Sequence, residues 1–384
     1  MVFAGIVVLA VGMLHWYLWL RLVRATTGRS ALRRAGGWVI GALSVLFAVT
    51  AVGNRALPRR YEPVLERVVG WPGYVWLALA GYLVLALAAL ELPAWLTRTV
   101  LRRGGTEDEA ADRTRRLLIA RGVAITAGLT ATAVTTKGMA TALGPPTTRR
   151  VRIPLAKLPR GMDGTRIALV SDIHLGALLG RAHTERVVAA VNALDADIVA
   201  VVGDLVDGTV GDLAPAAEPL RALRSRRGAY FVTGNHEYFS GHEDWIAHVG
   251  TLGLRVLRNA RVELDGLDLA GVNDATGGSV GDPPDYDLAL AGRDPARPVV
   301  LLAHQPVQAR EAAKRGVDLQ LSGHTHGGQL WPFHYVTSIS QPVISGLAVV
   351  DGMPVYVTNG AGFWGPPVRV GAAPDVTLVE LRSG

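Results

Sequence analysis

Long uncharged apolar segments in the first 150 residues constrain this chain more than any other feature. Met1 to Leu20 contains no charged residue, and similar runs follow further along the chain. Because a helix rises 1.5 Å per residue, about 20 apolar residues cross the ~30 Å hydrocarbon core of a bilayer. We therefore predict that residues 1–140 form a membrane anchor of about four transmembrane helices. The predicted spans lie near residues 2–22, 37–53, 73–90 and 117–137.

The fourth predicted span is the least apolar. Arg121 and five threonines interrupt it, and it crosses only with the Arg121 side chain reaching toward the near interface. If it crosses, everything after about residue 140 lies on the opposite side from the preceding loop. If it lies on the membrane surface instead, the large C-terminal domain stays on the cytoplasmic side.

The arginines of the anchor predict its orientation. The loops after the first and third apolar runs, residues 24–34 and 98–116, hold four and six arginines, whereas the loop between the second and third runs, residues 55–67, holds only four. The positive-inside rule counts basic residues in short loops, so residues 24–34 and 98–116 go to the cytoplasm. Residues 114–119 (TRRLLI) also resemble a twin-arginine export signal. Both features predict a multi-pass cell membrane protein whose large domain is extracytoplasmic.

Composition divides the chain in two and excludes several site types. Residues 1–150 hold 19 Lys and Arg against 7 Asp and Glu, whereas the remaining 234 residues hold 20 against 25. The overall charge of +7 therefore belongs to the anchor, and the acidic second part argues against a nucleic-acid partner. The absence of cysteine excludes disulfides, thiolate-bound metals and a thiol nucleophile.

After a predicted linker over residues 141–159, residues 160–384 show short β-rich runs that alternate with helix-like stretches. This alternation predicts an α/β domain, in which ligands gather at the carboxyl ends of the strands. The expected strands are 166–170, 198–202, 230–233, 268–272, 299–303, 318–321, 355–358 and 376–381.

Five polar clusters each follow one of these strands. Any one of them is ordinary turn chemistry, but together they supply two Asp, one Asn and several His, which are donors that suit Mn²⁺, Fe or Zn²⁺. In an extended segment, residues i and i+2 point to the same side, so a pair such as His324 and His326 presents two donors to one place. The clusters are residues 171–176 (SDIHLG), 203–208 (GDLVDG), 234–237 (GNHE), His304 and 323–328 (GHTHGG).

At these residues the chain closely resembles the calcineurin-like metallophosphoesterase superfamily. The Asp-x-His, Gly-Asp-x-x-Asp, Gly-Asn-His-Glu, lone His and Gly-His-x-His blocks occur complete and in order within residues 160–384. Residues 234–241 (GNHEYFSG), 323–329 (GHTHGGQ) and 360–371 (GAGFWGPPVRVG) extend the resemblance to its bacterial membrane-anchored or exported branch.

The resemblance implies a four-layer α/β sandwich that binds two metal ions, Mn, Fe or Zn. One ion is expected on Asp172, His174, Asp204 and His326. The other is expected on Asp204, Asn235, His304 and His324, so that Asp204 bridges. His236 corresponds to the family's catalytic histidine, which ligates no metal. Asp207 is expected to hold its loop by hydrogen bonds, and Arg369 to lie in the second shell or to meet a substrate phosphate.

These residues predict a metal-dependent phosphoesterase. Two cations clamp the attacking and leaving oxygens and lower the pKa of a bridging water, so a metal-bridging hydroxide is the expected nucleophile. Because the anchor restricts encounters to the bilayer, we expect lipid- or envelope-linked phosphoesters as substrates. The alternatives are a nuclease-type phosphodiesterase and a metal-binding membrane sensor without turnover. The sequence carries no signal for the oligomeric state.

Overall fold

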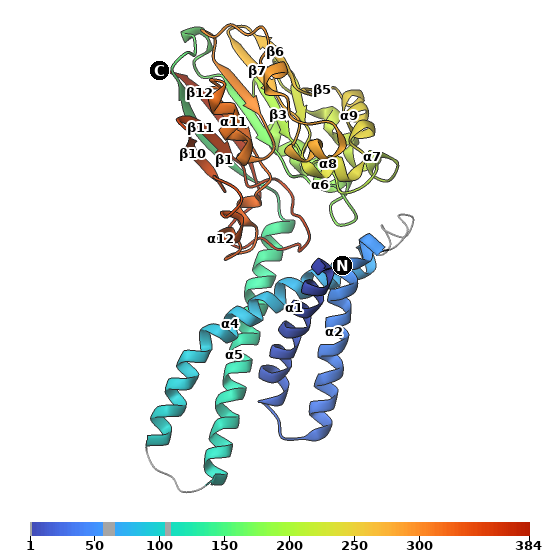
Figure 1. Cartoon of the computed structure of the whole chain (residues 1–384), viewed down its shortest axis with the longest axis vertical. Helices are drawn as coiled ribbons and strands as arrows, with labels where there is room; N and C mark the ends of the chain where they lie inside the picture. The colour runs from blue at the N-terminus through green and yellow to red at the C-terminus, as the bar shows by residue number, and fades with distance from the viewer. Residues whose placement is uncertain (1, 57–65, 104–108) are drawn as a thin grey trace. The chain divides into compact units, whose positions relative to one another are not determined.

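The computed structural model describes residues 2–56, 66–103 and 109–384 (Figure 1). The chain divides into two compact units. The helical unit comprises Met1–Ala140 together with Gly365–Val368. The α/β unit comprises Thr141–Trp364 and Arg369–Gly384. Each unit is described separately.

The helical unit contains most of the predicted anchor. Its elements are α1 (Val2–Leu18), the π-helical turn η1 (Trp19–Arg24), α2 (Ser30–Ala56), η3 (Glu66–Gly70), α4 (Trp71–Arg103) and α5 (Glu109–Leu143). Within the described ranges, three stretches are long and apolar enough to cross a membrane: Ser30–Thr50, Val68–Thr97 and Ala110–Leu143. They correspond to the second, third and fourth predicted spans. The first forms α1, a 17-residue helix that runs into η1, and the number of passes stays a prediction.

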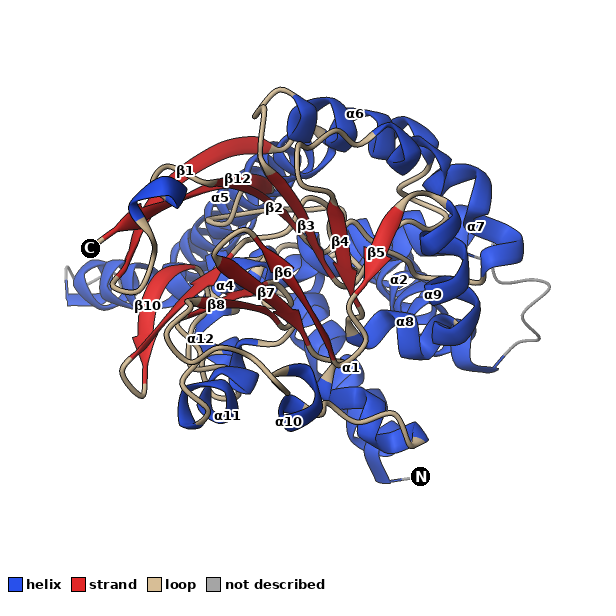
Figure 2. Ribbon diagram, turned by 90° about the horizontal axis from the view of Figure 1, so that it is seen from above, coloured by secondary structure: helices blue, strands red, loops and turns tan. Residues whose placement is uncertain are grey.

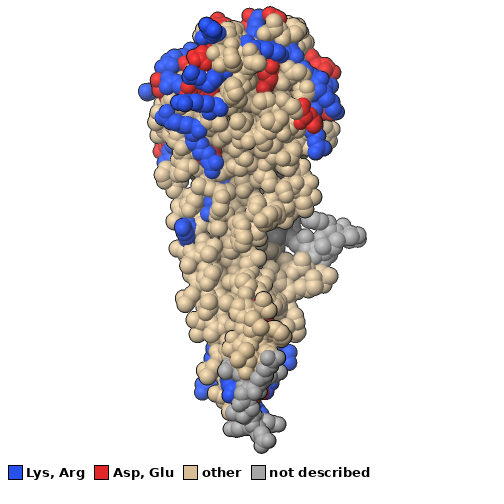
Figure 3. Space-filling model, turned by 90° about the vertical axis from the view of Figure 1, so that its left-hand side faces the viewer, with Lys and Arg blue, Asp and Glu red and all other residues tan. Residues whose placement is uncertain are grey.

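The helix ends that flank both arginine-rich connections lie at one end of the helical unit. α1 and α2 run in opposite directions, and so do α4 and α5, so that the α1–α2 connection and the adjoining ends of α4 and α5 point the same way (Figure 1). On the face drawn in Figure 3, Lys and Arg gather at this lower end, beneath a largely uncharged surface. The helix ends next to the two loops that the positive-inside rule assigns to one side of the membrane therefore share an end of this unit.

The α/β unit is built around two six-stranded sheets. The first has the order β1-β12-β2-β3-β4-β5, and the second has the order β10-β11-β9-β8-β7-β6. The strands are β1 (Thr147–Leu155), β2 (Arg166–Val170), β3 (Ile198–Val202), β4 (Ala229–Val232), β5 (Leu254–Val256), β6 (Ala260–Leu264), β7 (Leu267–Gly271), β8 (Val299–Leu302), β9 (Leu319–Ser322), β10 (Gly346–Val350), β11 (Met353–Val357) and β12 (Asp375–Ser383).

Helices cover the outer faces of both sheets, which gives four layers (Figure 2). Side chains of α6, α7 and α9 pack on the first sheet, and those of α10 and α11 pack on the second. Between the sheets lies a core of Ile, Leu and Val side chains. The predicted four-layer sandwich is thereby confirmed. The helices are α6 (Arg181–Asn192), α7 (Val210–Ala217), α8 (Asn235–Ser240), α9 (His242–Thr251), α10 (Tyr286–Ala289), α11 (Ala309–Lys314) and α12 (His334–Thr337).

The predicted linker over residues 141–159 is wrong for most of its length. α5 continues to Leu143, and β1 then pairs in parallel with β12 over nine residues. The strand buries Ile153 and Leu155 on its inner side, while its outward positions carry exposed arginines. Alternation of arginine with apolar residues is the pattern of an edge strand with one face in the core, and the nearby Gly and Pro residues hid it.

All eight expected strands are present, with ends that differ by two residues or fewer. β2, β3 and β4 are adjacent and parallel, and so are β7, β8 and β9. Parallel neighbours end at the same edge of a sheet, so the polar residues that follow β2, β3, β4, β8 and β9 are brought together.

Candidate metal centre

Several residues just after the strand ends have a left-handed backbone conformation. Asp172, His174, Asp204, His324 and His326 all have positive φ angles, between 50° and 72°. Asp and His tolerate the left-handed region better than bulkier residues, but such residues remain uncommon and cost about 1–3 kcal/mol each where they are strained. Five of the seven predicted metal ligands adopt this conformation.

The first predicted ligand cluster is assembled in the structure. Donor atoms of Asp172, His174 and His326 all lie within 4.8 Å of one another, and all three residues are buried. Nε2 of His174 lies 3.0 Å from Nε2 of His326, which in turn lies 3.4 Å from Asp172 Oδ1. Two imidazole nitrogens and a carboxylate oxygen that converge on one buried point form a donor set that suits a divalent metal ion.

The second predicted cluster lies beside the first. Asp204, His304 and His324 bring donor atoms within 4.8 Å of one another. Oδ1 of Asn235 lies 3.0 Å from Nδ1 of His324, so the predicted amide ligand joins the same group. Burial, followed by the charge of His304, lowers the pKa of His324 to about 3, which keeps its ring in the neutral form that binds metals.

His304 gives the clearest sign that this cluster fits a metal ion. Its Nδ1 donates to the carbonyl oxygen of Val202 at 2.8 Å, so Nε2 is the nitrogen that faces the cluster. Nε2 is buried and makes no hydrogen bond in the described part of the chain, although Asp204 Oδ2 lies 3.1 Å away. Although burial opposes it, the carboxylate of Asp204 raises the pKa of His304 well above its usual range, so this point favours a positive charge, which a metal ion in place of the proton would supply.

Asp204 occupies the position expected of a bridging ligand. Its Oδ2 lies 3.1 Å from Nε2 of His304 in the second cluster and 3.8 Å from Nε2 of His174 in the first. Its other oxygen, Oδ1, accepts a hydrogen bond from the backbone N–H of His236 at 2.9 Å. One carboxylate therefore faces both clusters and is also tied to the start of α8.

Asp207 organises two histidines from outside the clusters. Its Oδ1 lies 2.9 Å from Nδ1 of His174 and 2.6 Å from Nδ1 of His236. Because a carboxylate only accepts, the proton of His174 is fixed on Nδ1 and its Nε2 is free to bind a metal ion. The carboxylate therefore orients two histidine rings, and the predicted role of Asp207 in holding its own loop stays a prediction.

His236 lies next to the clusters without belonging to either predicted ligand set. Burial alone would lower the pKa of its imidazole, but the carboxylates of Asp204 and Asp207 outweigh that effect and raise the pKa to about 9. The ring is therefore protonated at neutral pH, as a proton donor has to be.

Arg369 supports a ligand from behind. Its side chain is 2% exposed, and it donates from Nη1 to the carbonyl oxygen of His326 at 2.7 Å. Nη2 lies 2.9 Å from Nδ1 of His326, and the remaining donors reach the carbonyl oxygens of Asn359 and Gly362. Burial and the Arg369 charge together hold the pKa of His326 well below its usual range. Of its two predicted roles, this buried position favours support of the ligand His326 over contact with a substrate phosphate.

Glu237 is a buried carboxylate whose role the sequence analysis did not identify. It accepts hydrogen bonds from the backbone N–H groups of Asp204, Leu205 and Gly234, at 2.6–3.0 Å. These bonds lock the loop after β3 to the loop after β4. The available signal was its place three residues after Gly234 at the start of a helix, where an acidic side chain turns back to cap the backbone.

Two motif glycines make room for ligand carboxylates. A Cβ on Gly234 would overlap Oδ1 of Asp204, and a Cβ on Gly323 would overlap Oδ2 of Asp172. Both glycines have ordinary φ angles, so it is the close approach of the neighbouring chain, not backbone conformation, that requires them.

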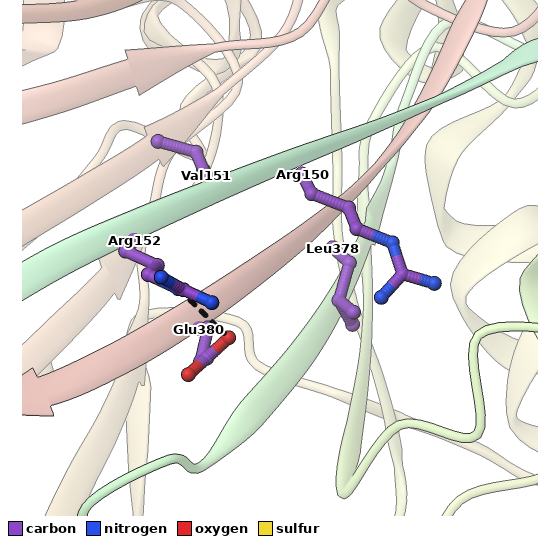
Figure 4. Close-up of a pocket in the computed structure, with 5 residues that line it drawn as sticks. All are labelled: Arg150, Val151, Arg152, Leu378 and Glu380. Carbon is purple, nitrogen blue, oxygen red and sulfur yellow. Dashed lines mark hydrogen bonds and ion pairs between the residues drawn. The ribbon is translucent and has the colours of Figure 1, made fainter.

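A hollow of about 380 Å³ elsewhere in this unit is unrelated to the metal clusters. It lies on β1 and β12, where Arg152 forms an ion pair with Glu380 at 3.5 Å and Arg150 and Leu378 line the same surface (Figure 4). It contains none of the predicted site residues, so the chemistry is assigned to the clusters at the strand ends.

Comparisons with known proteins agree with this geometry. A family model described as calcineurin-like phosphoesterase matches residues 165–328. A Danio rerio protein named transmembrane protein with metallophosphoesterase domain is 38% identical over 259 residues, which cover 64% of this chain and 59% of that protein. The Bos taurus protein of the same name is 36% identical over 312 residues, which cover 77% of this chain and 68% of its own length.

A shorter relative covers the α/β part. An Aquifex aeolicus protein named uncharacterized metallophosphoesterase is 36% identical over 235 residues, which cover 60% of this chain and 89% of its own. The relatives with transmembrane names, together with the three apolar helices, indicate membrane association for this chain. These similarities, together with the two clusters of candidate metal ligands, show that the chain belongs to the calcineurin-like metallophosphoesterase family.

Proposed function

We propose that this protein is a dinuclear-metal-dependent phosphoester hydrolase that acts at a membrane surface. The observation that carries the proposal is the position of Asp204 between a buried and a largely buried donor cluster, with the protonated ring of His236 beside them. A pair of metal ions would be held by Asp172, His174, Asp204 and His326 on one side, and by Asp204, Asn235, His304 and His324 on the other.

Metal ions bound there would act as Lewis acids toward the phosphoester and would activate water at neutral pH. The protein residues then have separate tasks. His236 holds a proton for the leaving oxygen, and Asp207 orients its ring through Nδ1. Asn235 offers a neutral amide oxygen, which adds no negative charge that would repel an anionic substrate.

The location of the site supports a lipid- or envelope-linked phosphoester as the substrate class. An anchor confines encounters to the bilayer plane, and the helix ends that flank both arginine-rich connections share one end of the helical unit (Figure 1). With those connections in the cytoplasm, an odd number of further crossings after residue 116 puts the α/β unit outside. The net charge of residues 151–384, 20 basic against 25 acidic, disfavours a nuclease.

The decisive experiment compares the wild-type protein with His236→Ala on a panel of lipid phosphates, nucleotide diphosphate lipids and aryl phosphates. General acid catalysis contributes about 10²–10⁴-fold, so we expect turnover to fall within that range. Metal content should stay at two ions per chain, because His236 is not a ligand. Unchanged turnover would reject the catalytic role, and lack of turnover in the metal-loaded wild type on every substrate would favour a sensor.

The predicted side of the membrane has a separate test. A reporter that is active only in the cytoplasm, fused after Gly384, should be inactive. A reporter in the connection between α1 and α2 serves as the matched positive control. Activity of the C-terminal fusion would place the α/β unit in the cytoplasm.

A further inference from the structure

One short segment of the α/β unit exposes an unusual density of large apolar side chains. Between residues 331 and 339 there are five, with exposed fractions from 52% to 85%. Single exposed apolar residues are normal on a protein surface, but five within nine residues form a patch that calls for a partner. We name it the apolar segment; its members are Trp331, Phe333, Tyr335, Val336 and Ile339.

The apolar segment is anchored at both ends. The backbone N–H of Trp331 donates to the carbonyl oxygen of Val370 at 2.9 Å. Beyond α12, the buried side chain of Gln341 accepts a hydrogen bond from the backbone N–H of Val307 at 2.9 Å. The exposed side chains are therefore presented by a fixed backbone.

The apolar segment lies near the point where the chain enters the α/β unit from its last apolar helix. Val370 holds Trp331, and four residues later the carbonyl oxygen of Pro374 accepts from the backbone N–H of Thr147 at 2.8 Å. Four residues span at most about 14 Å. Thr147 begins β1, only four residues after the end of α5 at Leu143. The patch and the chain entry thus belong to the same end of this unit.

Contacts of Trp364 connect the apolar segment with the metal centre. The side chain of Gln329 exchanges hydrogen bonds with the backbone of Trp364, at 2.9 and 3.2 Å. The ring of Trp364 is 59% exposed, and its centroid lies 6.0 Å from that of His236. An exposed aromatic side chain thus lies between the apolar segment and the histidine that we assign to proton transfer.

The charge of this region selects the kind of partner. Residues 319–350 contain no Asp, Glu, Lys or Arg. Trp and Tyr are enriched where proteins meet the boundary between lipid headgroups and acyl chains, because their rings are apolar with one polar group. An uncharged surface rich in such rings, close to a chain that leaves an apolar helix, matches a bilayer better than a charged soluble partner.

We propose that the apolar segment is a membrane-contact surface that sits in the interfacial layer of the lipid bilayer and holds the metal centre over phosphoesters embedded there. The contact with lipid stands independently of catalysis. The delivery of embedded substrate rests on the proposed function.

The first test measures the contact itself in the full-length protein. Because the chain has no cysteine, Ile339→Cys can be labelled uniquely with a polarity-sensitive fluorophore in vesicles of phosphatidylcholine and phosphatidylglycerol. Leu288→Cys, at an exposed position on α10, is the matched control. We expect lipid-borne quenchers to act on the probe at residue 339 and not on that at residue 288, with iodide showing the reverse order.

Equal quenching of the two probes by iodide would overturn the proposal. A signal at residue 339 that disappears when the protein is diluted in excess lipid would also overturn it, because the occupant would then be a second copy of the chain. Neither outcome depends on enzymatic activity, so failure of the contact can be told apart from failure of the proposed function.

The second test concerns substrate delivery. The combined variant Trp331→Ser, Phe333→Ser and Ile339→Ser is compared with Val280→Ser and Leu288→Ser, which remove exposed apolar side chains elsewhere. We expect turnover of a vesicle-embedded fluorescent lipid phosphoester to fall by about tenfold or more, since three large apolar groups leave the interface. Turnover of a soluble aryl phosphoester should not change. Equal effects on both substrates, or no effect on either, would refute delivery.

Discussion

Replacement of Asp207 tests how the first ligand cluster is held. Oδ1 of Asp207 faces Nδ1 of His174 at 2.9 Å and Nδ1 of His236 at 2.6 Å. Without this carboxylate the His174 ring can rotate and can carry its proton on Nε2, the atom directed at the metal position. We expect Asp207→Ala to weaken binding of one metal ion and to spare the other, because no ligand of the second cluster contacts Asp207.

The size of the effect follows from the bond to His174 alone. A hydrogen bond to a charged group contributes about 1.5–3 kcal/mol, and each 1.4 kcal/mol is a tenfold change in affinity. Asp207→Ala should therefore weaken one site about 10–150-fold. Asp207→Asn keeps an oxygen acceptor but loses the charge, and a neutral hydrogen bond contributes about 0.5–1.5 kcal/mol. The Asn variant should consequently fall between the wild type and Asp207→Ala.

Calorimetric titration of the metal-free full-length protein with Mn²⁺ measures both sites. His236→Ala is the matched control, because it removes the other partner of Asp207 while leaving every proposed ligand in place. It should lower turnover with both metal affinities unchanged. The reasoning is refuted if Asp207→Ala binds both ions with wild-type affinity, or if the two sites weaken equally.

Two further predictions concern stability. A Cβ at Gly234 overlaps Asp204, and overpacking typically costs about 1–3 kcal/mol, so Gly234→Ala should lower the melting temperature and the metal content. Gly250→Ala in α9, where no atom lies within 4 Å of the added Cβ, should be neutral or slightly stabilising; similar melting of the two variants by circular dichroism would contradict this. A ligand at 100 times its dissociation constant stabilises the folded protein by about 2.7 kcal/mol. Removal of the metal ions with a chelator should therefore lower the melting temperature, and adding them back should restore it. An unchanged melting temperature would argue against bound metals.

The strands that carry ligands could be predicted because each is a short buried apolar run that ends in polar residues. Parallel neighbours end together, so the convergence of the Asp172 and Asp204 loops followed from the order of strands and clusters. The missed strands lack this signal. β5 has only three residues, and β10, although its sequence is apolar, has mostly exposed or half-buried side chains and is not followed by a cluster of candidate ligands.

The support of the metal centre was harder to predict than its ligands. Arg369 is a single arginine near the C-terminus, and most of its partners are backbone carbonyl oxygens. Every residue has such an oxygen, so the sequence does not indicate which ones an arginine will bind. The burial of Arg369 could therefore not be predicted from the sequence, because it depends on how the surrounding loops fold. The exposure of Trp331 and its neighbours was hidden for the opposite reason, because an uncharged aromatic stretch in a sequence is ordinarily assigned to the core.

The pairing of β1 with β12 has a consequence for how the α/β unit folds. β12 lies between β1 and β2, so residues 375–383 form an inner strand of the first sheet although they come last among its strands. During synthesis, β1 has no partner for more than 200 residues after it emerges, and β2 has an open edge for nearly as long. Closure of this sheet is a late, long-range event. A truncation that removes β12 would leave β1 without a partner and β2 with an open edge, and exposed edges readily aggregate.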